Sequence, residues 1–88
     1  MHSVSILIPC YQERNFIRAC LESVRSFDLL PGTSVEIIVL DGMSTDGTRD
    51  IVSEIAAQDA RVTLVDNLKR TQSAALNLGI PLARGEYL

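Results

Sequence analysis

Apolar runs alternate with amphipathic segments along the whole chain. Three runs rich in β-branched residues, at residues 3–9, 35–41 and 61–67, are typical of strands buried on both faces. A fourth run opens at "GEYL", residues 85–88. Between the runs, apolar residues recur at steps of three and four, the spacing of one helix face. This alternation predicts an α/β fold in the order β-α-β-α-β-α-β, a Rossmann-like parallel sheet with helices on both faces.

Three helices are expected between these strands. The first carries an apolar stripe made up of Ile17, Cys20, Leu21 and Val24. The second ends near residues 58–59, and its N-cap is expected at Ser44, Thr45 or Asp46. Its own apolar stripe consists of Ile51, Val52, Ile55 and Ala56. The third begins within the Ala- and Leu-rich residues 71–77.

Composition and charge narrow the class of protein. The chain has 88 residues, 47% hydrophobic and 22% charged, which suits one globular domain or part of one. A net charge of −3 argues against a general nucleic-acid-binding surface. No apolar run approaches the roughly 20 residues that span a bilayer, and the N-terminal run lacks a basic leader. With two cysteines that lack metal-site spacing and are expected to be reduced, we expect a cytoplasmic protein.

Right-handed crossovers bring the loops that follow parallel strands to one edge of the sheet. In this chain those loops are "PCYQERN", "DGMSTDGT" and "DNLKRTQS", and each polar cluster of interest lies on one of them. A functional site is therefore expected at this edge of the sheet.

The first loop offers an aromatic ring and a carboxylate, Tyr11 and Glu13, after Pro9 ends the strand. In a purely structural interpretation, Tyr11 packs on the sheet edge and Glu13 complements a helix dipole. In the functional interpretation, the ring stacks on a nucleobase while Glu13 accepts a hydrogen bond from a sugar or base. For this loop alone, the structural interpretation is favoured.

The second loop places Asp41 where an apolar strand stops. An aspartate at the carboxyl end of a strand is a frequent ligand position in open α/β sheets, and it is equally a frequent turn former. The residues alone leave these two interpretations level. Asp46 and Gly47, by contrast, are best explained as a turn and cap ahead of a helix.

The third loop carries the basic pair Lys69 and Arg70 just before a helix, where basic side chains and unpaired helix N–H groups could meet an anion. Taken singly, a solvated basic pair is the simpler explanation.

The chain lacks the residues that other kinds of catalytic or phosphate-binding site require. His2 is the only histidine, and neither a GxGxxG nor a Walker-type loop is present.

Together, the three loops resemble the N-terminal part of a family 2 glycosyltransferase with the GT-A fold. The matching pieces, in the family's order and spacing, are "SILIPCYQERNFIRACLESV", "EIIVLDGMSTDGT" and "NLKRTQSAALNLGIPLARGEYL". They cover essentially the whole chain, and the ordered set is more specific than any one motif. The variants "DGMSTDGT" and "KRTQSAALN" are most similar to the exopolysaccharide, succinoglycan-type branch.

The resemblance implies a function and a set of site residues. The family transfers a sugar from a nucleotide-diphospho-sugar to a saccharide or lipid-linked acceptor, here expected in polysaccharide biosynthesis from a UDP-sugar, with Mg²⁺ or Mn²⁺ at the diphosphate. By resemblance, the nucleoside pocket is lined by Pro9, Tyr11 and Glu13. Asp41 is then expected near the base or ribose, and Lys69 towards the donor.

Two departures from the family pattern bear on this expectation. Many members carry Asp-Asp-Gly-Ser where this chain has Asp41, Gly42, Met43 and Ser44, so Gly42 replaces the second acid. A base contact from that acid is lost here or passes to Asp41. Many members also have an arginine where this chain has Leu76.

The family's metal-binding acids and catalytic base come after the strand opened by "GEYL", so they are expected beyond Leu88. Residues 1–88 are accordingly expected to form the nucleotide-binding part of a GT-A domain, incomplete at its C-terminus and inactive alone. Membrane association is expected only through later segments.

Two alternatives stay open at this level. One is a binding module without chemistry, self-associating through an open sheet edge. The other is a sugar nucleotidyltransferase, which needs a glycine-rich loop where this chain has "PCYQERN".

Overall fold

The computed structural model describes residues 3–26, 33–68 and 86–87. In chain order the elements are β1 (Ser3–Cys10), α1 (Ile17–Arg25), β2 (Ser34–Asp41), α2 (Thr48–Gln58), β3 (Val62–Asp66) and β4 (Glu86–Tyr87). Each strand begins and ends within one residue of its predicted bounds, and α2 ends where it was expected to end. The predicted α/β alternation is therefore confirmed for this part of the chain.

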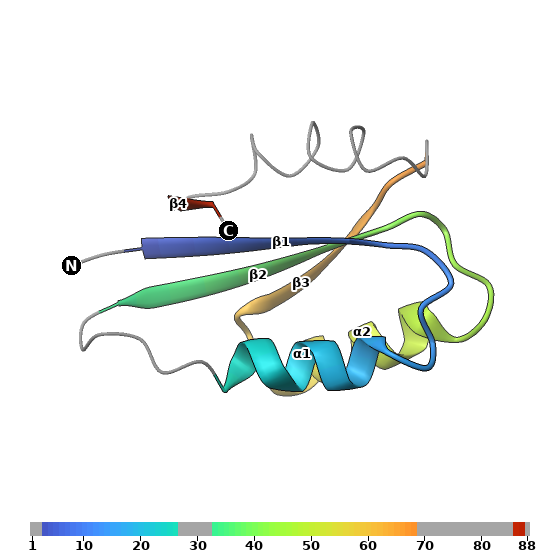
Figure 1. Ribbon diagram of the computed structural model, residues 1–88, viewed down its shortest axis with the longest axis horizontal. Helices are drawn as coiled ribbons and strands as arrows, with labels where there is room; N and C mark the ends of the chain where they lie inside the picture. Colours follow the sequence, from blue (N-terminus) through green and yellow to red (C-terminus); the bar gives the residue numbers. More distant parts are fainter. Residues whose placement is uncertain (1–2, 27–32, 69–85, 88) are drawn as a thin grey trace.

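The strands form one parallel sheet in the order β3-β2-β1-β4 (Figure 1). At its carboxyl edge the register aligns Cys10 with Asp41, and Asp41 with Asp66. The steps from β1 to β2 and from β2 to β3 move in one direction, whereas β4 returns to the side of β1. Ligands of open α/β sheets bind outside the carboxyl ends of the strands, at such a reversal of strand order. The topology therefore favours a ligand site at the same edge of the sheet that the sequence predicts.

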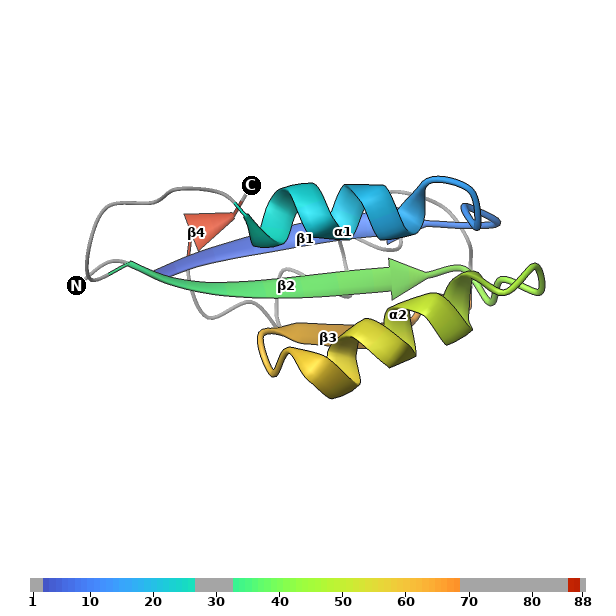
Figure 2. The same ribbon diagram turned by 90° about the horizontal axis from the view of Figure 1, so that it is seen from below.

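Both described helices cover the same face of the sheet (Figures 1 and 2). This arrangement follows from the topology, because two right-handed crossovers that step in the same direction put their helices on the same side. The helix predicted from residues 71–77 lies outside the described residues, so the expectation of helices on both faces stays a prediction.

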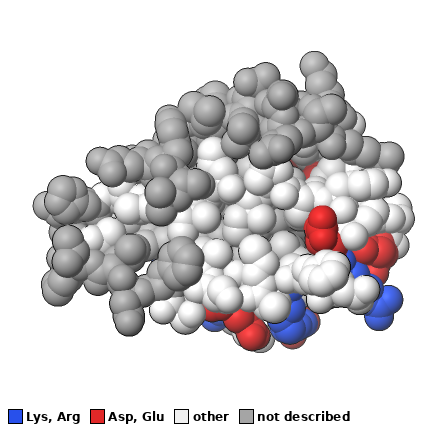
Figure 3. Space-filling view, viewed as in Figure 1, with Lys and Arg blue, Asp and Glu red and all other residues white. Residues whose placement is uncertain are grey.

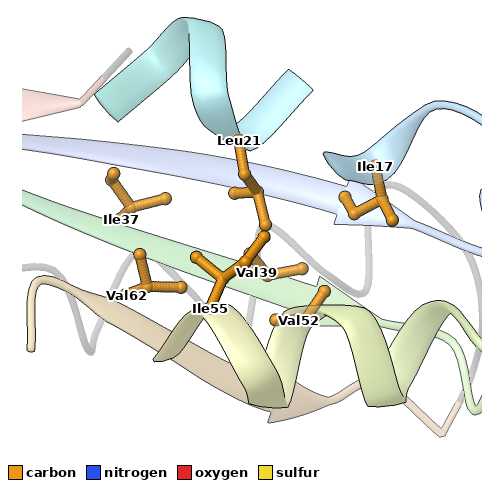
Figure 4. Close-up of a cluster of buried hydrophobic side chains, with 7 residues drawn as sticks. All are labelled: Ile17, Leu21, Ile37, Val39, Val52, Ile55 and Val62. Carbon is orange, nitrogen blue, oxygen red and sulfur yellow. The ribbon is translucent and has the colours of Figure 1, made fainter. Parts of the chain in front are cut away.

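The core lies between the two helices and the sheet. Figure 4 shows seven buried side chains pointing into this layer, namely Ile17, Leu21, Ile37, Val39, Val52, Ile55 and Val62. On the opposite face of the sheet, Ile38 and Leu40 are also buried. The central strand β2 is thus apolar on both sides, which explains its continuous run of apolar residues.

The apolar stripe of α1 is narrower than the sequence suggested. Ile17 and Leu21 are buried, and Val24 is half-buried. Cys20, which was expected to fill space on this stripe, is exposed. Helical geometry turns about 100° per residue, so Cys20 lies at the margin of the stripe while the other three share its centre.

Candidate functional site

The loops after β1 and β2 lie side by side beyond the carboxyl edge of the sheet (Figure 2). On the face seen in Figure 3, charged side chains of both signs gather at this end and along the helices, and the surface over the sheet is uncharged. The candidate site is built from these two loops, the ends of the three strands and the first turn of α2.

Gln12 joins the first loop to the second. Its backbone N–H donates to Oγ of Ser44 at 2.8 Å. Its side-chain carbonyl accepts from the N–H of Thr45 at 2.6 Å, and its amide nitrogen donates to the Thr45 hydroxyl at 3.2 Å. Three hydrogen bonds from one residue thus hold the loops together.

Thr48, the first residue of α2, extends the same junction. Its fully buried hydroxyl accepts from the backbone N–H of Glu13 at 2.9 Å. The carbonyl of Glu13 in turn accepts from the N–H groups of Phe16 and Ile17, where α1 begins. The backbone of Glu13 therefore connects the starts of both helices.

Asp46 and Gly47 have the structural role that the sequence predicted. Oδ1 of Asp46 accepts from the N–H of Thr48 at 3.0 Å, and Oδ2 accepts from the N–H of Arg14 at 3.1 Å. The Thr48 hydroxyl also donates to Asp46, and this bond is the main reason that the pKa of Asp46 is lowered. The N-cap position itself is Gly47 with φ of 101°, a backbone conformation that favours glycine. The expected N-cap at Ser44, Thr45 or Asp46 is therefore wrong, because α2 begins only at Thr48.

The carboxylate of Asp41 is fully buried and fully hydrogen-bonded. Oδ2 accepts from the N–H of Ser44 at 2.8 Å and from Nη1 of Arg49 at 3.0 Å. Oδ1 accepts from the Ser44 hydroxyl at 2.5 Å and from Sγ of Cys10 at 3.4 Å. These contacts make Asp41 the organiser of the turn that follows β2.

The environment of Asp41 keeps it ionised. Burial raises the pKa of the carboxyl group, but the hydrogen bonds from Ser44, Arg49 and Cys10 outweigh that effect, and the net pKa is lowered. The pKa of Arg49 is raised by its hydrogen bond to Asp66 and then by its bond to Asp41. Arg49 therefore bridges the ends of β2 and β3, whose carboxylates are neighbours in the sheet register.

Cys10 is the partner of Asp41 at the end of β1. Burial, the hydrogen bond to Asp41 and the charge of Asp41 together raise the pKa of the Cys10 thiol to about 12. A thiol in this state is a hydrogen-bond donor and a poor nucleophile.

The sequence-predicted site residues are placed as follows. Pro9 is half-buried in β1 opposite Leu40, Tyr11 is 42% exposed, and Glu13 is half-buried. The structure brings these residues and Asp41 to one edge, with Asp41 behind the loop junction and Tyr11 at the surface. Lys69 lies outside the described residues. Contact of each with a nucleotide stays a prediction.

Four residues of this edge were missed as site residues, namely Gln12, Ser44, Arg49 and Asp66. In the sequence, Ser44 is typical of a helix cap, and Gln12, between two candidates, carries no signal of its own. Arg49 follows Asp41 by eight residues and lies on a different element. Only the strand register and the placement of α2 show that it reaches two strand ends.

An exposed aromatic ring, a nearby carboxylate and a firmly held loop can bind a nucleoside by stacking on its base and accepting from its sugar hydroxyls. Among residues 3–26 and 33–68, no group of three or more His, Cys, Asp or Glu side chains could hold a metal ion. The expectation that metal ligands and a catalytic base follow Leu88 stays a prediction. In the same described part of the chain, no helix is long and apolar enough to cross a membrane.

Residues 5–88 match the model of the family described as "Glycosyl transferase family 2". The chain is 44% identical over 75 residues to the succinoglycan biosynthesis protein ExoA of Rhizobium meliloti (strain 1021), covering 85% of this chain and 22% of that protein. It is 35% identical over 86 residues to the putative glycosyltransferase EpsH of Bacillus subtilis (strain 168), covering 98% of this chain and 24% of that protein.

Among solved structures, the chain is similar to the mannosyltransferase PcManGT from Pyrobaculum calidifontis in complex with GDP-Man and Mn²⁺. The TM-score is 0.82 at 30% sequence identity, and the match covers 93% of this chain and 24% of that one. The chain therefore spans about a quarter of the length of each of these three proteins.

Proposed function

Because the chain belongs to glycosyl transferase family 2, we propose that its carboxyl edge binds the nucleotide of a nucleotide-diphospho-sugar donor for glycosyl transfer. The observation that carries this proposal is the match, at a TM-score of 0.82, to a mannosyltransferase whose structure contains GDP-Man and Mn²⁺. The reversal of strand order at β1 and β4 places this edge where open α/β sheets bind ligands.

In this proposal the residues of the edge divide the work. Tyr11 stacks on the base, and Glu13 accepts a hydrogen bond from the base or the ribose. Asp41, whose oxygens already accept four hydrogen bonds, supports the pocket from behind. It contacts the nucleotide only if Arg49 or Ser44 gives up its hydrogen bond to the carboxylate. By resemblance, Lys69 is proposed to contribute on the side of the donor, and it lies outside the described residues.

The finer assignments are part of the proposal. A role in exopolysaccharide synthesis is supported by the similarity to the succinoglycan biosynthesis protein. The proposed donor is a UDP-sugar, and GDP is the competing base because the similar mannosyltransferase was solved with GDP-Man. The metal at the diphosphate is proposed to be Mg²⁺ or Mn²⁺. The cytoplasmic location is supported by Cys10 and Cys20, which are free thiols as in a reducing compartment.

We propose further that residues 1–88 contribute the donor-binding part of the transferase, with transfer itself depending on later segments. The chain covers only about a quarter of each of the three relatives named above, and by resemblance the base that deprotonates the acceptor is expected beyond Leu88.

The test is titration of the ¹⁵N-labelled protein with UDP, GDP and ADP in the presence of Mg²⁺, followed by NMR. Binding is expected to shift the amide signals of Tyr11, Glu13 and Ser44. The nucleotide that binds most tightly identifies the base of the donor. If none of the three shifts these signals, the proposal is wrong.

Two exposed aromatic residues of the first loop provide a matched pair of variants. Base stacking is worth about 1–3 kcal/mol, so Tyr11→Ala is expected to weaken binding roughly tenfold or more. Phe16, 68% exposed at the start of α1, is not proposed to touch the nucleotide, and Phe16→Ala should bind like the wild type. Equal losses in the two variants would contradict stacking on Tyr11.

A further inference from the structure

Gln12 lies between Tyr11 and Glu13 and has a backbone φ of 54°. This left-handed conformation is uncommon for any residue other than Gly, Asn or Asp, because the Cβ atom crowds the following carbonyl group. A residue in such a conformation is held there by its surroundings. The contacts that hold Gln12 are therefore informative about the loop.

All three contacts lead to two consecutive residues of the other loop. The carboxamide of Gln12 pairs with Thr45 at two points, accepting from its N–H at 2.6 Å and donating to its hydroxyl at 3.2 Å. The N–H of Gln12 donates to Oγ of Ser44 at 2.8 Å, and that hydroxyl donates to Oδ1 of Asp41 at 2.5 Å. A continuous path of hydrogen bonds thus runs from the first loop to the buried carboxylate.

We infer that Gln12 is a positioning residue, whose carboxamide clamps the loop after β1 to Thr45 and thereby sets Tyr11 and Glu13 relative to Asp41. This inference rests on the proposed function, because the orientation matters for binding only if the nucleotide lies at this edge. The residues on both sides of Gln12 share its backbone, so a rotation at Gln12 redirects both side chains at once.

The side-chain length of Gln12 is what the clamp requires. Asn is better tolerated at positive φ, but its carboxamide is one methylene shorter and does not reach both groups of Thr45. Gly removes the backbone strain and the carboxamide together. Gln12→Asn and Gln12→Gly therefore relieve strain while breaking the clamp, which separates positioning from folding stability.

The matched control variants are on the other loop. Thr45→Ser keeps the hydroxyl and the N–H, so it preserves both contacts. Thr45→Ala removes the hydroxyl and keeps the N–H, so it breaks one of the two. The loss of nucleotide affinity is therefore expected to be absent in Thr45→Ser, intermediate in Thr45→Ala, and largest in the Gln12 variants.

The experiment measures nucleotide affinity by calorimetry, melting temperature, and hydrogen exchange at the Thr45 amide in all five proteins. The probe is whichever of UDP, GDP or ADP shifts the wild-type amide signals most. Gln12→Asn and Gln12→Gly are expected to bind it about tenfold more weakly, to melt within a few degrees of the wild type and to exchange the Thr45 amide faster. Thr45→Ser is expected to match the wild type in all three measurements.

The outcomes distinguish this inference from the proposed function. Wild-type affinity in the Gln12 variants, with faster exchange at Thr45, would overturn the positioning role while leaving nucleotide binding intact. Unchanged exchange at Thr45 would overturn the clamp itself. If the wild type binds none of the nucleotides, the proposed function fails together with the positioning role, and the exchange data still decide whether Gln12 holds Thr45.

Discussion

Arg49 pairs with the buried carboxylate of Asp41, with Nη1 of the arginine 3.0 Å from Oδ2 of the aspartate. The side chain of Asp41 has no exposed surface, whereas that of Arg49 is 30% exposed. A buried carboxylate is costly unless it is paired and hydrogen-bonded. Asp41 meets that condition through groups from β1, its own turn and α2, so the end of β2 depends on three elements at once.

Replacing Arg49 should therefore lower the stability of the protein more than replacing an ordinary surface arginine does. We expect Arg49→Met to lower the free energy of unfolding by about 2–4 kcal/mol, because it leaves the Asp41 charge buried without its counter-ion. The matched control is Arg18→Met. Arg18 pairs with Glu54 at 3.3 Å with both side chains about half exposed, and such pairs contribute about 0–1 kcal/mol. Urea unfolding measures both, and similar losses would contradict the special role of Arg49.

Acid should destabilise the protein through its carboxyl groups. The pKa values of Asp41, Asp46 and Asp59 are all lowered in the folded chain, that of Asp59 mainly by hydrogen bonds from Arg61. A lowered folded pKa contributes stability that is present above the unfolded value of about 3.9 and is lost as the pH falls towards the folded value. We expect the free energy of unfolding to decrease from about pH 4 downwards.

Asp59 provides the variant that tests this assignment. In Asp59→Asn the side chain no longer titrates, so the decrease in stability below about pH 4 should be shallower than in the wild type. The measurement is urea unfolding at a series of pH values. Parallel curves for the two proteins would show that Asp59 is not one of the groups responsible.

The two thiols should differ sharply in reactivity. Cys20 is exposed, whereas Cys10 has a pKa raised to about 12 and is almost entirely protonated at pH 8. A thiol reagent such as iodoacetamide is therefore expected to label Cys20 quickly and Cys10 very slowly in the folded protein. Mass spectrometry of the labelled peptides reads out both sites, and Cys20→Ser should remove the fast phase. Equal rates at the two positions would contradict the half-buried contact between Cys10 and Asp41.

Neighbouring residues of α1 should respond very differently to truncation. Leu21 is fully buried between the helices and the sheet, so Leu21→Ala is expected to cost about 2–5 kcal/mol. Cys20→Ala, one residue earlier on the exposed side, should change stability by less than about 0.5 kcal/mol. Chemical unfolding followed by circular dichroism measures the stability of both variants. A large loss of stability in Cys20→Ala would show that Cys20 belongs to the buried stripe of α1.

Much of the fold was predictable because its signals are local. Continuous β-branched runs identify the buried strands, and the spacing of Ile17, Leu21 and Val24 identifies the helix face that meets the sheet. The alternation of the two patterns was enough for the α/β class and for the edge at which the loops meet. Asp46 and Gly47 were also predicted correctly as the turn ahead of α2, because turns depend on neighbours in sequence, although the N-cap is Gly47 and none of the three expected residues.

The turn after β2 was less predictable. The left-handed conformation in this turn belongs to Met43, with φ of 63°, although Met is not a residue that favours it. The residues alone left Asp41 level between a turn former and a ligand, and the resemblance then favoured a contact with the base or ribose. The structure shows the turn role, through Ser44, and adds a second role as the buried partner of Arg49.

The sequence by itself determined which segments are strands and helices, because those depend on periodicity and on the conformational preferences of neighbouring residues. The tertiary structure alone decided how the polar residues of the edge are used. Gln12 meets Thr45 across 33 positions of sequence, and Arg49 reaches Asp66 only because β2 and β3 align Asp41 with Asp66. Hydrogen bonds between distant residues depend on strand register and helix placement, and these are set by packing of the whole core.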